Sequence, residues 1–152
     1  MKRRTFLKGT FAATTAGIAI GAGLLSPSTI LADWAEHKDA FAAMSLKDAI
    51  TAIGGIGEAS TDITITAPDI AENGAVVPVE ITSTIAGVTS IHILVEKNSQ
   101  PLSAIFTLGK KAETYVSNRF KIGKSGDVIA VVKAGDKVYN AKKQVKVTKG
   151  GC

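Results

Sequence analysis

Short apolar runs rich in Val, Ile and Thr fill the chain from Asp62 onward, and Gly, Pro, Asn and Asp separate them. Ile63 and Ile65 alternate with Thr64 and Thr66, as in a strand that is buried on one face. The pattern predicts seven strands, at about residues 62–66, 76–84, 90–96, 103–108, 113–121, 127–133 and 137–147. Seven short strands at this spacing favour an all-β fold, an immunoglobulin-like β-sandwich.

Local signals refine three of these strands. Ala134-Gly135-Asp136 between two apolar runs predicts a hairpin turn, and Asn140 indicates a bulge or break inside the last strand. Pro78 lacks a backbone donor within the run Ala75–Val79, which is compatible with a core strand that has its proline at an edge. This run can belong to the core or to a surface that receives a second subunit, and we expect core for most of it.

One short helix is expected before the strands. Ser45, followed three residues later by Asp48, resembles an N-cap with a capping box, and Gly54 is a natural C-terminal cap. Trp34 and Phe41 precede this helix, and we expect them to be packing anchors rather than ligand contacts. The helix has an apolar face, formed by Leu46, Ile50 and Ile53.

The first 32 residues look like a twin-arginine export signal. Arg3 and Arg4 precede Phe6, and the following stretch from residue 9 to residue 32 is uncharged. We expect cleavage after Ala32 and export to an oxidising space; the alternative is an N-terminal anchor that is not cleaved. The predicted organisation is therefore a signal peptide at 1–32, a sandwich domain at 33–148 and a flexible arm at 149–152.

Removal of the signal peptide changes the charge. The signal holds four of the basic residues and no acid, so the net charge falls from +5 to +1. We therefore expect no nucleic-acid binding, which needs a basic surface in the folded domain, and no membrane association after cleavage. The C-terminal part from residue 101 is cationic, with 11 basic and three acidic residues. These lysines can be solvated strand edges, or they can attract anionic substrates and acidic partners.

Cys152 is the only cysteine and follows Gly150-Gly151 at the end of the sequence. Two glycines form a flexible hinge, and from Lys149 to Cys152 an extended chain covers roughly 13 Å. This geometry suits a carrier that offers a thiol to the clefts of other proteins. A buried thiol and an intermolecular disulfide are alternatives, whereas a prenylation box needs its cysteine four residues from the end.

Other catalytic or metal-binding equipment is sparse. The two histidines, His37 and His92, are expected to be structural, and with one cysteine they make no zinc-ligand pattern. No phosphate-binding loop or serine elbow is present in the sequence. Two alternatives to a carrier stay open: a thiol enzyme in which Cys152 meets a base such as His92, and a structural sandwich that is cross-linked through Cys152.

Three segments carry a resemblance to a known family: Ala67–Val79, Glu96–Leu102 and the terminal Val147–Cys152. Together with the twin-arginine leader they are similar to the SoxY family, the sulfur-carrying subunits of the periplasmic Sox thiosulfate-oxidation system. The resemblance covers essentially the whole mature chain. It implies an immunoglobulin-like sandwich in the periplasm that forms a heterodimer with a SoxZ-like subunit and is acted on by other Sox enzymes.

The resemblance also implies the site residues. Cys152 would be the attachment point of sulfur intermediates derived from thiosulfate, and Gly150 and Gly151 would be its swinging arm. The protein would be a carrier without a cofactor and without catalytic residues of its own. The family tail usually continues Gly-Gly-Cys-Gly-Gly, whereas this sequence stops at Cys152. An α-carboxylate on that residue would disfavour the thiolate, and Lys149 could offset part of this effect.

Overall fold

The computed structural model describes residues 27–149. Two compact units divide the chain, at residues 1–36 and 37–152, and the fold described below is that of the second unit. Two helices precede the strands: α2 (Pro27–Ala42) and α3 (Leu46–Ala52). Within the described part of the chain, neither is long and apolar enough to span a membrane.

Nine strands follow the helices. The seven predicted strands are confirmed, and two pairs of residues, β1 and β3, add short strands that the sequence did not predict. The bounds are β1 (Glu58–Ala59), β2 (Ile63–Thr66), β3 (Ile70–Ala71), β4 (Val77–Ser83), β5 (Val88–Val95), β6 (Leu102–Thr107), β7 (Tyr115–Phe120), β8 (Gly126–Ala134) and β9 (Lys137–Val147).

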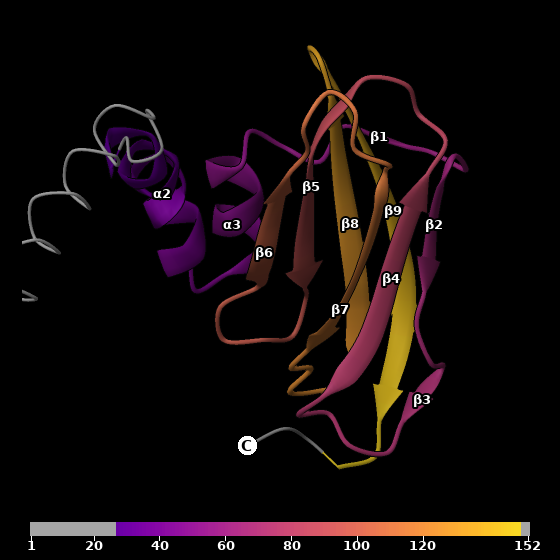
Figure 1. Cartoon of the computed structure of the whole chain (residues 1–152). Coiled ribbons are helices and arrows are strands. Elements are labelled where there is room, and N and C mark those ends of the chain that lie inside the picture. Colours follow the sequence, from indigo (N-terminus) through magenta and orange to yellow (C-terminus); the bar gives the residue numbers. More distant parts are fainter. Residues whose placement is uncertain (1–26, 150–152) are drawn as a thin grey trace, which may run out of the picture. The chain divides into compact units, whose positions relative to one another are not determined.

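The strands form two sheets that face each other, as predicted for a sandwich (Figure 1). The larger sheet has the order β1-β9-β8-β5-β6, with β3 also paired to β9, and the smaller has the order β2-β4-β7. Apolar residues of both sheets fill the space between them, as in β4, where Val77, Val79 and Ile81 are buried and Pro78 is exposed. Of the run Ala75–Val79, only Val77 and Val79 are buried, whereas Ala75, Val76 and Pro78 are exposed, so the expectation of core for most of this run was wrong.

Pro78 lies in a core strand, β4, at a point where one side of this strand has no neighbour, as expected for an edge proline. β4 is the central strand of the smaller sheet, but β2 pairs with it only from Glu80 to Ser83. Because β2 does not reach Pro78, no β2 carbonyl is left without a donor at this position.

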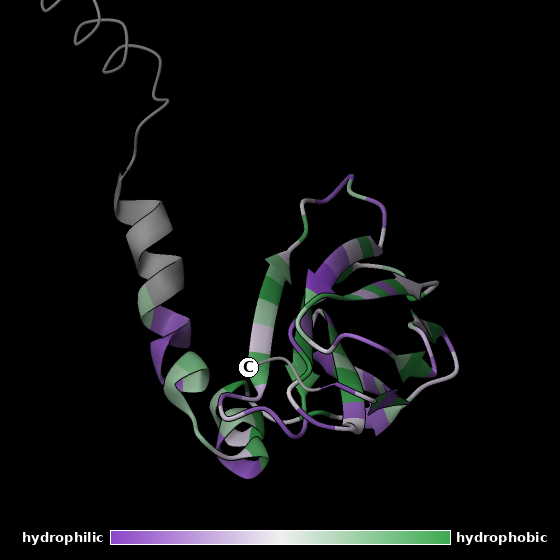
Figure 2. Ribbon diagram, turned by 90° about the horizontal axis from the view of Figure 1, so that it is seen from below, coloured by the Kyte–Doolittle hydropathy of each residue, from purple (hydrophilic) through white to green (hydrophobic). Residues whose placement is uncertain are grey.

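Two central strands of the larger sheet, β5 and β8, are buried on both faces, which explains their long apolar runs. In β5, Ile91, Ile93 and Val95 face the smaller sheet, whereas Leu94 belongs to a second cluster with residues of the helices. Phe41 packs against this second cluster, as predicted, whereas the side chain of Trp34 lies outside what the structure describes. Polar and apolar residues lie on opposite sides of α3 (Figure 2). The buried members of the second cluster are Ala40, Ala49, Ile53, Leu94, Leu102, Ile129 and Val131.

Both ends of α3 are capped close to where the sequence predicted. The hydroxyl oxygen of Ser45 accepts from the Asp48 N–H at 3.1 Å and donates to the Asp48 carboxylate at 2.7 Å. The C-cap is Ile53, one residue before the predicted Gly54, and Gly54 follows it with a φ of 85°, which favours glycine. Lys133 adds a third contact, because its ammonium donates to the Ile53 carbonyl at 2.7 Å.

The expectation of a single helix was wrong. α2 extends across the predicted cleavage point after Ala32, so its first part lies in the stretch that we assigned to the export signal. Pro27 is its first residue, a position at which the missing N–H of proline costs no helical hydrogen bond.

The last hairpin is confirmed, but Asn140 is neither a bulge nor a break. Gly135 has a φ of 59°, and Ala134 pairs with Lys137 across a two-residue turn. The register of β8 with β9 continues without a shift past Asn140. The Asn140 amide is buried and donates to the carbonyls of Ile56 and Gly57, each at 3.1 Å, which anchors the segment before β1 to β9.

Candidate functional site

The segment that leads to Cys152 is β9, the longest strand of the larger sheet. β8 pairs with it on one side, and on the other side the short strands β1 and β3 run parallel to it. β3 lies at the C-terminal end, where Ile70 pairs with Lys146 and Ala71 with Val147. The missed strand β3 thus holds the last residues of β9 in the sheet.

Hydrogen bonds continue past the end of β9. The Thr148 N–H donates to the Ala71 carbonyl at 3.1 Å, and its hydroxyl donates to the Glu72 carbonyl at 3.2 Å. The carbonyl of Lys149 accepts from the Gly74 N–H at 2.9 Å. The segment from Ala71 to Gly74 therefore holds the backbone of the chain up to its last described residue.

Ser125, in the loop between β7 and β8, also holds the C-terminal end of β9. Its hydroxyl oxygen accepts from the Val147 N–H at 2.8 Å, although the two residues are 22 positions apart. We call the group formed by Gly74, Ser125, Val147, Thr148 and Lys149 the tail base. Sequence reasoning did not find it, because its contacts join loops that are distant along the chain.

The predicted site residues lie at and beyond the tail base. Lys149 is exposed, and its carbonyl is bonded to the body, so the first residue of the predicted arm is attached there. Gly150, Gly151 and Cys152 lie outside the described residues.

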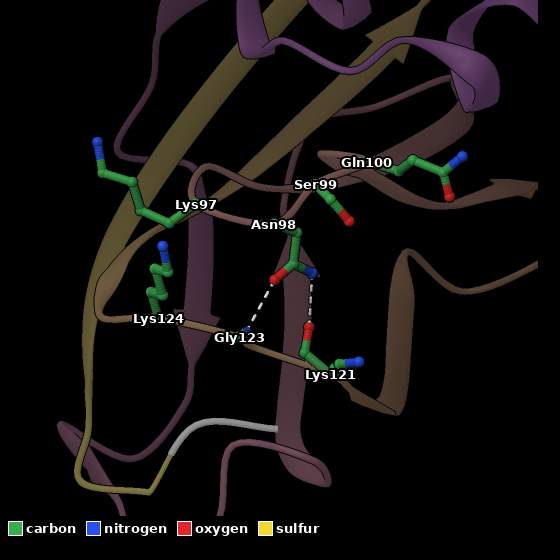
Figure 3. Close-up of a pocket in the computed structure, with 7 residues that line it drawn as sticks. All are labelled: Lys97, Asn98, Ser99, Gln100, Lys121, Gly123 and Lys124. Carbon is green, nitrogen blue, oxygen red and sulfur yellow. Dashed lines mark hydrogen bonds between the residues drawn. The ribbon is translucent and has the colours of Figure 1, made fainter. Parts of the chain in front are cut away.

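A hollow of about 540 Å³ lies between the loops that follow β5 and β7 (Figure 3). These loops are at the same end of the sandwich as the C-terminal end of β9 (Figure 1). Gly74 of the tail base is bonded to one of these loops, because the Gly74 carbonyl accepts from the Ile122 N–H at 2.7 Å. We call the hollow the lysine hollow. It is lined by Lys97, Asn98, Ser99, Gln100, Lys121, Gly123 and Lys124.

Asn98 joins the two walls of the lysine hollow. Its side-chain amide donates to the Lys121 carbonyl at 2.7 Å, and its side-chain oxygen accepts from the Gly123 N–H at 2.8 Å (Figure 3). Lys97 and Lys124 extend on one side of Asn98 in that view, whereas Lys121 extends on the other.

Of the three lysines that line the hollow, one forms an ion pair within residues 27–149 and two do not. Lys97 forms an ion pair of 2.8 Å with Glu96, which raises the pKa of the Lys97 ammonium. The same contact, together with a hydrogen bond from the Asp127 N–H, lowers the pKa of the Glu96 carboxyl. Lys121 and Lys124 are exposed and form no ion pair within residues 27–149.

The histidines occupy a different part of the molecule. His92 is 1% exposed, and its Nε2 lies 3.0 Å from the Ser90 hydroxyl. The ring of His37 meets it edge to face, with 5.9 Å between the ring centroids. Burial, with smaller contributions from the positive charges of Lys133 and His37, lowers the pKa of His92 to about 4.

His92 is not brought near the tail base. It pairs with Val131, which pairs with Asn140, so it lies level with a residue seven positions before Val147. Those seven positions correspond to roughly 23 Å along the strand, well beyond the roughly 13 Å that the residues after Thr148 can cover. Within the described residues, no group of three or more His, Cys, Asp and Glu side chains is arranged to hold a metal ion.

Comparison with known proteins agrees with this architecture. The sulfur carrier protein SoxY from Chlorobium limicola f. thiosulfatophilum is 42% identical, with a TM-score of 0.62 over 68% of this chain and 96% of that one. A superoxide reductase (neelaredoxin) from Ignicoccus hospitalis is 18% identical, with a TM-score of 0.51 over 56% of this chain and 79% of that one. The second likeness shows a common fold alone.

The search of curated protein sequences gave no match. The family model described as sulfur oxidation protein SoxY matches residues 49–152, which contain all nine strands, the tail base and the lysine hollow. Since this match spans more than half of the sequence, the chain belongs to the SoxY family of sulfur oxidation proteins.

Proposed function

We propose that this protein is a sulfur carrier that holds sulfur intermediates covalently on Cys152 and presents them to partner enzymes. The observation that carries the proposal is the place of the cysteine, three residues beyond the hydrogen-bonded carbonyl of Lys149. A thiol on a short tether with a fixed origin can enter another protein's cleft while the sandwich stays outside.

The loading step would join the Sγ atom of Cys152 to the outer sulfur of thiosulfate. A thiolate and a thiosulfate dianion together carry three negative charges, and the S–S product, which ends in a sulfonate, carries one. Two electrons must therefore leave, and we assign them to a partner redox enzyme. Lys149 would favour the thiolate, since a cation within a few ångströms lowers the pKa of a thiol.

We propose that the sandwich itself is not a catalyst in this step. A Cys-His pair requires the base to lie within hydrogen-bond reach of the thiol. The only bases of this type in the sequence are His37 and His92, and the latter is buried about 23 Å along the sheet from the end of β9. With its pKa lowered to about 4, His92 is also a weak base at neutral pH.

Single substitutions test the carrier proposal. The purified protein is incubated with thiosulfate and its partner oxidase, and the adduct is measured by intact-mass spectrometry with and without a reductant. We expect Cys152→Ser to abolish the adduct, and His92→Ala and His37→Ala to keep it, with circular dichroism confirming that each variant is folded. Loss of the adduct in folded His92→Ala would instead support a thiol enzyme. Recovery of Cys152 only in disulfide-linked dimers would support a structural cross-link.

We further infer that the protein pairs with a SoxZ-like subunit. Within residues 27–149, the outer edges of β6 and β7 pair with no other strand, so a strand of a second subunit could pair there. Tyr115 on β7 is 49% exposed. Co-expressed chains should elute together from a sizing column at low and high salt, because buried apolar contacts are not screened. A complex that requires Cys152 would overturn this inference.

We also propose a periplasmic location after export by the twin-arginine pathway. Arg3→Lys together with Arg4→Lys should leave the precursor in the cytoplasm, as shown by cell fractionation. Unchanged periplasmic accumulation of this double variant would exclude the pathway.

A further inference from the structure

We propose that the lysine hollow is a binding site for a small sulfur oxoanion that ends in an –SO3 group. The inference rests on the proposed carrier function and adds a place on the body for the charged end of its cargo. The same chemistry has two sources: free thiosulfate, or the terminal sulfonate of an adduct on Cys152.

The position of the hollow fits either source. Gly74, a member of the tail base, joins the two: its N–H donates to the Lys149 carbonyl, and the Gly74 carbonyl accepts from the Ile122 N–H. Ile122 lies between two lining residues, Lys121 and Gly123. The three residues that follow the bonded carbonyl of Lys149 cover roughly 10 Å when extended, which we take as sufficient to pass Gly74 and reach the hollow.

The walls are held in place before any ligand arrives. Asn98 uses both ends of its side-chain amide to connect one loop to the other, at Lys121 and Gly123. The backbone adds a bond of 2.9 Å from the Glu96 N–H to the Asp127 carbonyl. Binding therefore requires ordering of the lining side chains and not of the loops, which limits the entropic cost of binding.

The donors match an oxoanion. A sulfonate offers three acceptor oxygens, and the hollow supplies ammonium groups, the hydroxyl of Ser99 and the amide of Gln100. Glu96 already pairs with Lys97, whereas Lys121 and Lys124 form no ion pair in the described chain and keep their charge for a ligand. No carboxylate lines the hollow, so an anion meets no like charge on its walls.

The hollow is large enough for its ligand with water around it. Its volume of about 540 Å³ lies within the range of roughly 300–1,000 Å³ that is usual for small-molecule sites. The lysine side chains are flexible, so they can turn inward when an anion enters. Removal of two of the charges should therefore weaken binding without changing the walls.

The first experiment tests the free anion. Cys152→Ser protein is titrated with sodium thiosulfate at low ionic strength, and backbone amide shifts are followed by NMR. We expect saturable shifts at Ser99, Gly123 and Lys124, and a dissociation constant about tenfold higher, or about 1.4 kcal/mol weaker binding, when Lys121→Gln and Lys124→Gln are added. The matched control is Lys110→Gln with Lys111→Gln, two exposed lysines in the loop between β6 and β7, which should bind like the parent.

The second experiment tests the tethered sulfonate. The reduced wild-type protein is treated with tetrathionate, so that the Cys152 thiolate displaces thiosulfate and keeps an S–S–SO3 group. We expect the same amides to shift on loading, and the shifts to be lost in the variant with glutamine at 121 and 124. Loading itself is confirmed by intact mass in every variant.

The outcomes separate the two sources and the two proposals. Shifts with free thiosulfate identify a site for the free anion, and shifts on loading alone identify a site for the tethered sulfonate. Equal affinities of the Lys121/Lys124 and Lys110/Lys111 variants, or no shift in either experiment, would overturn the proposed site. The carrier function would stand in that case, because adduct formation by the partner oxidase is measured independently.

Discussion

The backbone N–H of Gly74 donates a hydrogen bond of 2.9 Å to the carbonyl of Lys149, three residues before Cys152. Gly74 is buried, and its carbonyl accepts from Ile122 in the next loop. The origin of the tail is thus fixed to two loops, so the reach of the thiol is set by the three residues that follow. A fixed origin for the residues that lead to the cysteine is what the proposed carrier requires.

Ser125 should contribute measurably to the tail base. In Ser125→Ala the Val147 N–H loses its acceptor at 2.8 Å, and this half-buried donor has to find water instead. We expect a loss of about 1 kcal/mol in local stability, seen as faster hydrogen exchange of the Val147 amide. Ser117→Ala is the control, since that exposed hydroxyl bonds the Glu80 carboxylate far from the tail. Unchanged exchange at Val147 would remove Ser125 from the tail base.

The two glycines should matter for handling of the cargo rather than for stability. We expect Gly150→Pro with Gly151→Pro to keep the melting temperature, because the change lies beyond β9, and to slow processing of the bound sulfur by partner enzymes several-fold, because proline fixes φ. Labelling of Cys152 by a small thiol reagent should persist. Alanine at both positions is the control, as it stiffens the chain less. Equal processing rates for the proline variant and the native protein would show that flexibility is irrelevant.

The fold could be predicted from the sequence where the signal is local. The alternation in Ile63–Thr66, the run Ile91–Val95 and the Gly135-Asp136 turn each reflect the chemistry of neighbouring residues, and each prediction is confirmed. β1 and β3 were missed because each has two residues and exists only through pairing with β9. A two-residue strand leaves no periodicity to detect.

The candidate site, too, could be predicted only where its signal is local in the sequence. Cys152 is visible in the sequence because composition and position alone mark it. The lysine hollow could not be predicted, because Asn98 bonds Lys121 and Gly123, which lie 23 and 25 residues further along the chain. The prediction for Asn140 was wrong for a related reason. Asparagine is frequent at irregular positions, but here a long-range hydrogen bond to the Gly57 carbonyl satisfies its amide inside a regular strand.

Gly57 should be the least replaceable glycine of the described body. A Cβ at this position would collide with the backbone carbonyl of Val138, and its φ of 61° disfavours other residues. We expect Gly57→Ala to lower the free energy of unfolding by at least about 3 kcal/mol in urea titrations. Gly109→Ala, where a Cβ meets nothing within 4 Å, is the control and should change it by less than about 0.5 kcal/mol. Similar losses in both variants would mean that the contact of Gly57 with β9 is not tight.

His92 should make the stability of the sandwich depend on pH. Its pKa is about 4 in the folded protein, against about 6.5 for an unperturbed histidine. Between these values the unfolded chain binds more protons than the folded one, so the free energy of unfolding falls as pH falls. The contribution of His92 is complete above about pH 6.5, declines below it and levels off below about pH 4, with a total of about 3 kcal/mol.

Substitution of the titrating ring isolates this contribution. We expect the free energy of unfolding of His92→Leu, measured by urea titration from pH 4 to pH 7.5, to be flatter with pH than that of the native protein, because leucine suits a position 1% exposed and carries no proton. Ser90→Ala is the control: it removes the partner of Nε2 at 3.0 Å but keeps the buried ring, so its curve should run parallel to that of the native protein. Asp69 and Glu96, whose carboxyl pKa values are lowered by ion pairs with lysines, add acid sensitivity to all three proteins alike and cancel in the comparison. Parallel curves for His92→Leu and the native protein would show that His92 is protonated as readily in the folded state as in the unfolded one.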